Sequence, residues 1–214
     1  MTFRLNIGCG QTPTLGPDWL NFDGSPTVRL VRLPIISRLA LLLLDPAQRD
    51  FFGFCQTHDI RYADATKRIP VPDRSADVLY SSHMLEHLTR QEARRFLSEA
   101  RRILVSGGII RLAVPDLWKH VGWYIVEKDG DEFMRSIQLG RDTVSQKTRL
   151  AQAIFGDRGH KWFYDGSSLI KLLTDAGFCD ASVWPAGQTM IPAPAQLDLS
   201  ERADISVFAE ARCP

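Results

Sequence analysis

The sequence lacks a surplus of charge of either sign. Its 26 lysines and arginines nearly balance its 25 aspartates and glutamates, which leaves a formal net charge of +1 at pH 7. Proteins that bind nucleic acid along an extended surface usually carry a clear basic excess. We therefore expect no nucleic-acid partner.

Long apolar runs and paired cysteines are also missing. The most apolar stretch, residues 33–45, is interrupted by Arg38 and is shorter than the roughly 20 residues that a membrane-spanning helix needs. The four cysteines show no C-x-x-C spacing, so the sequence predicts neither a zinc ribbon nor a thioredoxin-like motif. With no signal-peptide pattern at the start, a reducing cytoplasm is the expected location.

Short apolar segments alternate with helical patterns along the chain. The expected strands are residues 3–8, 19–23, 57–65, 76–82, 109–115, 181–186 and 204–211. Thr89 and Glu92 form a T-x-x-E capping box before one amphipathic helix, and Gly177 ends a second helix that starts near Ser167. This alternation predicts an α/β fold with a parallel sheet covered on both faces.

Two glycines follow the first expected strand. Gly8 and Gly10 begin a G-x-G pattern, but residue 13 is proline, so the third glycine of the dinucleotide-binding pattern is absent. The connection to the next strand is too short for the helix whose N-terminus would bind a pyrophosphate. Asp23 ends that next strand, where a carboxylate can accept both hydroxyls of a ribose. The pattern therefore predicts a nucleoside without phosphates, such as S-adenosylmethionine.

Six segments stand in a characteristic order along the chain: LNIGCG, WLNFD, YADAT, ADVLYSSHMLEHL, GGIIRLAVPD and HKWFYDGSSLIKLLTDAGF. Taken together, they resemble the class I S-adenosylmethionine-dependent methyltransferases, type 11-like group. The resemblance implies a Rossmann-like, seven-stranded, mostly parallel sheet with an antiparallel last strand and helices on both faces. It also implies a single domain, residues 1–214, with insertions at about 24–57 and 117–158. The short connection after the first strand departs from the family pattern.

The same resemblance implies roles for individual residues. It places these residues at the cofactor: Gly8, Cys9, Gly10, Asp23, Asp64, Ala65, Ser81 and Ser82. Asp23 would hold the ribose, and Asp64 would meet the adenine edge unless it only caps a turn. His83 would lie near the reacting methyl group, and His83 and His160 are the candidate bases that take the acceptor's proton.

The strongest competing pattern is HMLEH, residues 83–87. It matches H-x-x-E-H, in which two imidazoles hold zinc and the glutamate acts as a base. No third ligand stands out in the sequence, so we expect no metal. Glu86 and His87 are instead expected to be structural and to hydrogen-bond the surrounding loops.

The segment from Trp118 to Tyr164 follows the fifth expected strand, so it can reach over the carboxyl ends of the sheet on the acceptor side. His160 lies in the glycine-rich loop GDRGHKWFYDG and is either a surface-loop residue or a general base that faces the substrate. Trp118, Trp123 and Tyr124 are expected to belong to the core rather than to a substrate wall. Residues 28–54 are expected to form a lid, a dimer surface or a membrane-surface segment; the lid and the dimer are favoured, so a homodimer stays open.

These observations predict an enzyme that transfers a methyl group from S-adenosylmethionine to oxygen or nitrogen of a small-molecule or glycan-like acceptor. A nucleoside- or S-adenosylmethionine-binding protein without catalysis is the first alternative. A zinc-dependent hydrolase that uses HMLEH is the second.

Overall fold

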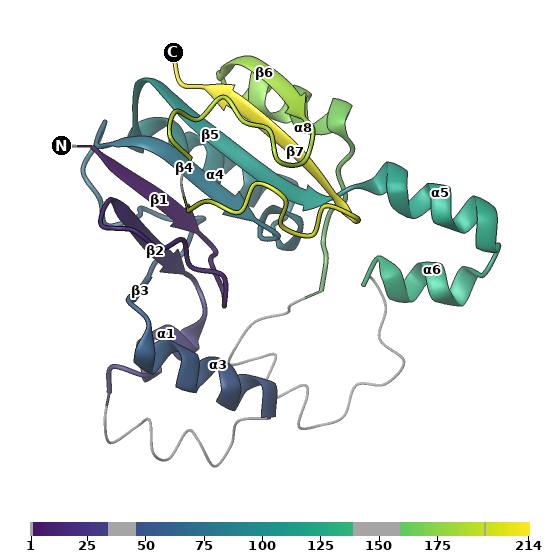
Figure 1. Cartoon of the computed structure of the whole chain (residues 1–214), viewed down its shortest axis with the longest axis horizontal. Coiled ribbons are helices and arrows are strands. Elements are labelled where there is room, and N and C mark those ends of the chain that lie inside the picture. Colours follow the sequence, from purple (N-terminus) through teal and green to yellow (C-terminus); the bar gives the residue numbers. More distant parts are fainter. Residues whose placement is uncertain (1, 34–45, 139–158, 195) are drawn as a thin grey trace.

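The computed structural model describes residues 2–33, 46–138, 159–194 and 196–214. Seven strands form one sheet in the order β3-β2-β1-β4-β5-β7-β6 (Figure 1). They are β1 (Phe3–Ile7), β2 (Trp19–Asp23), β3 (Ile60–Tyr62), β4 (Ala76–Ser82), β5 (Leu104–Pro115), β6 (Cys179–Trp184) and β7 (Ser206–Arg212). Only β7 runs antiparallel to its neighbours β5 and β6. The predicted seven-stranded, Rossmann-like sheet with an antiparallel last strand is confirmed.

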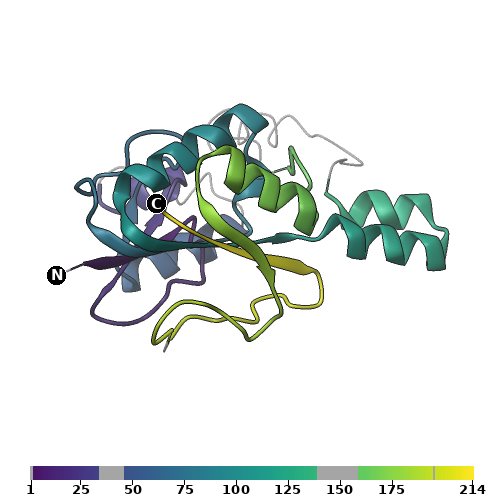
Figure 2. The same cartoon turned by 90° about the horizontal axis from the view of Figure 1, so that it is seen from above.

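Helices lie on both faces of this sheet. They are α1 (Pro26–Leu30), α3 (Pro46–Thr57), the short 3-10 helix η1 (Leu85–His87), α4 (Arg90–Ile103), α5 (Leu117–Glu127), α6 (Gly130–Ser136) and α8 (Gly166–Asp175). Figure 2 shows α4 and α8 together on one face. On β3, Ile60 lies beside Asn21 and so points away from the side of Phe22, which packs under α4. Ile60 packs with α1 and α3, so these two helices cover the other face near β3.

The larger core lies under α4 and α8 because both helices are amphipathic. The buried residues of α4 recur every three or four positions: Ala93, Phe96, Leu97, Ala100 and Ile103. The predicted capping box is confirmed. The Thr89 hydroxyl accepts the Glu92 N–H at 3.3 Å, and the Glu92 carboxylate accepts the Thr89 N–H at 2.7 Å.

Strand β5 starts earlier than predicted. It begins at Leu104 rather than at residue 109, but its first part is irregular. Gly107 has a φ of +79°, and the pairing with β4 shifts so that Leu104 lies opposite Ala76 while Ile109 lies opposite Val78. The bulge lengthens β5 without moving the regular part that the sequence predicted.

A long segment, instead of a helix, covers the middle of the sheet face opposite α4 and α8, which we call the second face. Residues 8–18 connect β1 to β2 through turns alone, which leaves this face without the usual first helix. Residues 185–194 and 196–205, between β6 and β7, cross the face on the side opposite α4 and α8 (Figure 2). Ile191 and Leu197 from this segment pack against Trp19 of β2 and Tyr80 of β4.

A buried ion pair fixes this segment to the sheet. Arg111 on β5 and Glu210 on β7 lie 2.6 Å apart, and both side chains are 0% exposed. The Arg111 guanidinium also donates to the carbonyl oxygens of Gln188 and Leu199, at 2.9 and 3.0 Å. The Glu210 carboxylate accepts the N–H of Met190 at 2.7 Å. Both charges are thus hydrogen-bonded to the backbone of the covering segment, as buried charges require.

Helices α5 and α6 form a hairpin that extends away from the sheet beyond the carboxyl end of β5 (Figures 1 and 2). The exposed fractions of Trp118, Trp123 and Tyr124 are 75%, 44% and 45%. The expectation that these three residues belong to the core is wrong, because α5 packs mainly on α6 and leaves the sheet.

Several sequence expectations fall outside the described part of the chain. Residues 34–45 hold most of the apolar segment, and residues 139–158 hold the end of the second predicted insertion. The lid, dimer and membrane-surface interpretations therefore stay predictions, as does the single domain. Among the described residues, no helix is long and apolar enough to span a bilayer.

Candidate functional site

The predicted site residues gather where β1, β2 and β4 end. The strand order reverses between β1 and β4, because the chain passes from β1 to β2 on one side and later returns to β4 on the other. In open α/β sheets, this switch point at the carboxyl ends of the strands forms the ligand-binding crevice. Gly8 follows β1, Asp23 ends β2 and Ser82 ends β4.

Asp23 is held beside the glycine turn by the backbone. The N–H of Gly10 donates to one carboxylate oxygen at 3.0 Å, and the N–H of Ser25 donates to the other at 2.7 Å. Each carboxylate oxygen can accept a second hydrogen bond. The side chain is therefore oriented before any ligand binds and keeps acceptor capacity on both oxygens.

The two glycines of the turn are required for different reasons. Gly8 has a φ of +74°, and a Cβ atom there would lie 2.5 Å from Cγ of Met84. Gly10 has a φ of +49°, but a Cβ atom there would have no neighbour within 4 Å. Gly8 thus allows the loop after β4 to approach β1 closely, whereas Gly10 serves the backbone conformation alone.

The side chain of Cys9 points away from the carboxyl ends of the strands. Its side chain is buried with Val28, Phe51 and Cys55, in the cluster formed with α1 and α3. Burial, together with the nearby Asp23 carboxylate, raises the pKa of the Cys9 thiol far above its usual value. The backbone of Cys9, rather than its thiol, is the part that lines the glycine turn.

Asp64 forms a turn at the end of β3. One carboxylate oxygen accepts both the N–H and the hydroxyl of Thr66, at 2.9 and 2.7 Å, and the other lies 3.1 Å from the Lys67 ammonium. Burial raises the pKa of Asp64, but these hydrogen bonds and the lysine together outweigh burial and hold the pKa below its usual value. The turn-capping role considered for Asp64 is therefore real. Ala65 is half-buried and packs against the main core.

The two serines at the end of β4 differ in what they can bind. The Ser81 hydroxyl is buried and donates to the carbonyl oxygen of Ile7 at 2.8 Å, which ties β4 to β1. The Ser82 hydroxyl is also buried but makes no hydrogen bond. Ser82 thus keeps both donor and acceptor capacity at the switch point.

His83 is hydrogen-bonded on one side of its ring and lies close to a carboxylate on the other. Nε2 lies 2.8 Å from the Ser206 hydroxyl, and Nδ1 lies 3.4 Å from a carboxylate oxygen of Glu86. The backbone of His83 has a φ of +48°, which is uncommon for a residue with a side chain. The side chain is 7% exposed, so His83 is part of the frame of the site.

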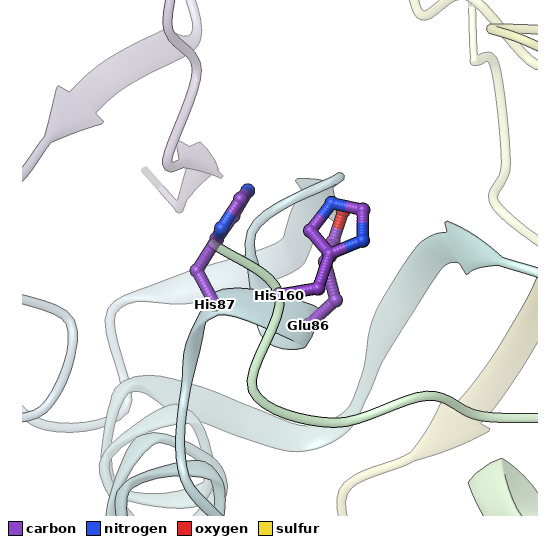
Figure 3. A group of neighbouring side chains, drawn as sticks. All are labelled: Glu86, His87 and His160. Carbon is purple, nitrogen blue, oxygen red and sulfur yellow. The ribbon is translucent and has the colours of Figure 1, made fainter. Parts of the chain in front are cut away.

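Glu86, His87 and His160 form a compact group, which we call the Glu86 cluster (Figure 3). One ligand atom from each of the three residues lies within 4.8 Å of the other two. Glu86 is 1% exposed, and neither of its carboxylate oxygens makes a hydrogen bond with residues 2–33, 46–138, 159–194 or 196–214. The sequence pattern 83–87 missed this group because His160 comes from a distant part of the chain.

Backbone contacts bring His160 to Glu86. The N–H groups of Lys161 and Trp162 both donate to the carbonyl oxygen of Glu86, at 2.7 and 3.2 Å. A ring nitrogen of His87 lies 3.3 Å from the carbonyl oxygen of Gly159. The expected structural hydrogen bonds are therefore confirmed for the His87 side chain and for the Glu86 backbone, but not for the Glu86 carboxylate.

His160 is half-buried and is not a simple surface-loop residue. Its ring centre lies 5.0 Å from that of His87 and 5.2 Å from that of Phe163. Burial lowers the pKa of His160, and the nearby Glu86 carboxylate opposes this shift only in part. Its Nδ1 atom is buried and has no hydrogen-bond partner in the part of the chain that the structure describes.

One protein-family model matches part of this chain. Residues 37–112 match the family model described as "Methyltransferase domain", a match that includes Asp64 and residues 81–87 but not the glycine turn or Asp23. No curated protein sequence matches the chain.

The solved structures with a similar fold include two methyltransferases. One is an S-adenosylmethionine-dependent methyltransferase from Archaeoglobus fulgidus, with 15% identity and a TM-score of 0.52 over 99% of this chain and 86% of that chain. The other, from Thermotoga maritima, is described as a possible histamine N-methyltransferase; it has 15% identity and a TM-score of 0.50 over 100% of this chain and 83% of that chain. At these identities the likeness concerns the fold.

Proposed function

We propose that this chain, which matches the methyltransferase domain over residues 37–112 and has the class I methyltransferase fold, transfers a methyl group from S-adenosylmethionine. The acceptor is a small or glycan-like molecule that is methylated at oxygen or nitrogen. The observation that carries the proposal is the position of Asp23, which the backbone holds beside the Gly8–Gly10 turn at the switch point of the sheet.

The donor site follows from the groups at this edge. The second lone pairs of the two Asp23 oxygens accept the two ribose hydroxyls. The left-handed glycines and the backbone of Cys9 let the main chain approach the methionine part of the donor. Asp64 with the backbone of Ala65 is assigned to the adenine edge. Ser82 is assigned to the methionine amine, because its buried hydroxyl is unpaired.

Ser81 contributes in a different way from the one implied by the family resemblance. Its hydroxyl already donates to Ile7, so it contributes to donor binding by holding β4 against β1. We therefore assign Ser81 a positioning role.

The candidate proton acceptor is His160 rather than His83. Nε2 of His83 is hydrogen-bonded to Ser206 and its Nδ1 lies 3.4 Å from the Glu86 carboxylate, whereas Nδ1 of His160 has no hydrogen-bond partner among the described residues. A lone pair on the acceptor attacks the methyl carbon, and the carbon–sulfur bond breaks with its electron pair on sulfur. The products are the methylated acceptor and S-adenosylhomocysteine, and His160 takes the proton that the acceptor loses. Because the sulfonium already activates the methyl group, alignment of donor and acceptor supplies most of the remaining catalysis.

Calorimetry tests the donor site. S-adenosylmethionine and S-adenosylhomocysteine should bind, and NAD should bind far more weakly. Asp23→Asn should weaken S-adenosylhomocysteine binding by about 1.5–3 kcal/mol, which corresponds to about 10- to 150-fold, as expected for hydrogen bonds to a charged group. Asp59→Asn is the matched control, since Asp59 is an exposed carboxylate beside β3. Equal binding of NAD, or equal effects of the two substitutions, would contradict the proposal.

Turnover tests the acceptor side once a panel of small hydroxyl and amine compounds has yielded an acceptor. His160→Ala should leave donor affinity within about threefold and reduce turnover by about 10²–10⁴-fold, the usual range for a general base. Normal turnover in this variant would remove His160 from the mechanism. Donor binding without turnover on any acceptor would favour a binding protein without catalysis.

A further inference from the structure

Glu86 is buried without the partners that a buried carboxylate requires. The residue is 1% exposed, and neither carboxylate oxygen makes a hydrogen bond with any described residue. Nδ1 of His83 lies 3.4 Å from one of these oxygens, but without hydrogen-bond geometry. An ionised carboxylate in such surroundings costs several kcal/mol unless it is paired or coordinates a metal.

The atoms around this carboxylate are metal ligands by type. The chain has five histidines, and three of them surround Glu86. His87 and His160 bring one ring nitrogen each within 4.8 Å of a Glu86 oxygen and of each other, and Figure 3 shows these rings beside the carboxylate. Two imidazoles and one carboxylate form the ligand set of many zinc sites with an open fourth position.

We propose that Glu86, His87 and His160 bind a divalent transition-metal ion of the zinc class, with a fourth position open to water or another ligand. This site differs from the inverted peptidase pattern, because His160 replaces His83. No metal was expected from the sequence, since no third ligand could be recognised there; the fold supplies one from 73 positions along the chain from His87.

The surrounding backbone prepares the ligands. A ring nitrogen of His87, Nδ1, lies 3.3 Å from the carbonyl oxygen of Gly159, so it carries the proton and leaves Nε2 free for the ion. The two N–H groups that follow His160 donate to the Glu86 carbonyl oxygen and fix the two segments together. In a tetrahedral site with metal–ligand bonds of about 2 Å, the ligand atoms are roughly 3.4 Å apart. Side-chain rotations that move the ligand atoms by about 1 Å would bring the three residues to this separation.

The choice of ion follows from the ligand types. Imidazole nitrogen suits zinc, cobalt, nickel and iron, whereas magnesium and calcium prefer oxygen ligands throughout. Cobalt therefore serves as a spectroscopic probe, because its visible absorption reports the coordination geometry. An ion on His160 would occupy the lone pair that accepts a proton, so ion binding and proton transfer by this residue exclude each other.

The test uses the full chain without an affinity tag, carrying Cys179→Ser, because Cys179 is an exposed thiol that could bind zinc on its own. Zinc per chain is measured by elemental analysis after dialysis, and zinc affinity by competition with a chromophoric chelator. We expect one zinc per chain and a visible cobalt spectrum typical of four-coordination. A site built for zinc should bind roughly one ion per chain. The proposal is overturned if the protein holds fewer than about 0.2 zinc ions per chain at every zinc concentration at which it stays soluble.

Variants identify the ligands. Glu86→Gln and His160→Ala should each weaken zinc binding by more than about 100-fold, since even an outer-shell partner contributes about 10–100-fold. His83→Asn, which suits the left-handed backbone, should weaken it by no more than about tenfold. His58→Ala, a histidine stacked on Phe54 and outside the cluster, should leave it unchanged. Loss of zinc in His83→Asn with retention in His160→Ala would overturn this ligand set. Donor binding is measured separately in chelator, so failure of the metal site and failure of the proposed methyl transfer are distinguishable.

Discussion

Replacing Arg111 with methionine should destabilise the protein strongly. The substitution removes the partner of Glu210 at a site where both side chains are 0% exposed. Glu210 would keep its hydrogen bonds from Thr189 and Met190 but would lose its only ion pair within the described residues. The carbonyl oxygens of Gln188 and Leu199 would also lose the hydrogen bond from Arg111, although that of Leu199 would keep the N–H of Gly187.

The expected magnitude follows from the isolated charge. Breaking a buried ion pair by removing one partner costs about 3–5 kcal/mol. For a chain of this length, 1 kcal/mol shifts the melting temperature by about 2–4 °C, so Arg111→Met should lower it by about 6–20 °C. The double variant, Arg111→Met with Glu210→Gln, removes the unpaired charge as well. It should regain at least about 1 kcal/mol relative to the single variant, because the two sites are coupled.

Urea unfolding of the single and double variants measures these free energies. Arg135→Met is the matched control, because its ion pair with Glu132 is exposed on both sides and such pairs contribute about 0–1 kcal/mol. A loss below about 1 kcal/mol in Arg111→Met, or strictly additive effects in the double variant, would refute the reasoning from the buried charge.

Three further predictions concern local features. Gly8→Ala should destabilise the protein more than Gly10→Ala in urea unfolding, because both need a left-handed backbone, at about 1 kcal/mol each, but only Gly8 also faces a neighbouring methionine; equal losses would contradict the close approach. The pKa of Asp64 is lowered in the folded state, so the ionised carboxylate stabilises the protein above about pH 4 and this effect is lost as the pH falls through the folded pKa. The difference in unfolding free energy between wild type and Asp64→Asn should therefore shrink below about pH 4. A difference that does not depend on pH would count against this prediction. Trp118→Ala should change the free energy of unfolding by less than about 0.5 kcal/mol, whereas Phe96→Ala should cost about 3–5 kcal/mol; a large effect at Trp118 would place it in a contact that its 75% exposure does not reveal.

The elements that the sequence predicts well have local signals. The helix after Thr89 has a capping box at its start and apolar residues at helical spacing, so its bounds follow from neighbouring residues alone. The glycine turn and Asp23 were also predictable, because both stand at the ends of short apolar strands. Each of these features depends on residues within about one helical turn of each other.

The features that sequence reasoning missed depend on distant contacts. The cover formed by residues 185–194 and 196–205 has no periodic pattern, and its anchors, such as the Arg4 guanidinium donating to the carbonyl of Pro192, join residues 188 positions apart. The approach of His160 to Glu86 rests on backbone hydrogen bonds from residues 161 and 162, which any residue type other than proline could make. The sequence does place His83 and His87 beside Glu86, but only the fold brings His160 to the same carboxylate.

The covering segment also constrains how the chain can fold while it is being synthesised. The face formed by Trp19, Val78, Tyr80 and Ile109 is complete once β5 has left the ribosome, yet its cover lies beyond residue 185. Until then a nascent chain presents an apolar sheet face, a state in which unfinished domains tend to associate with each other or with chaperones. A ribosome that stalls between β5 and β6 would therefore leave a product with a nearly formed sheet and one face open, prone to aggregate rather than to remain unfolded.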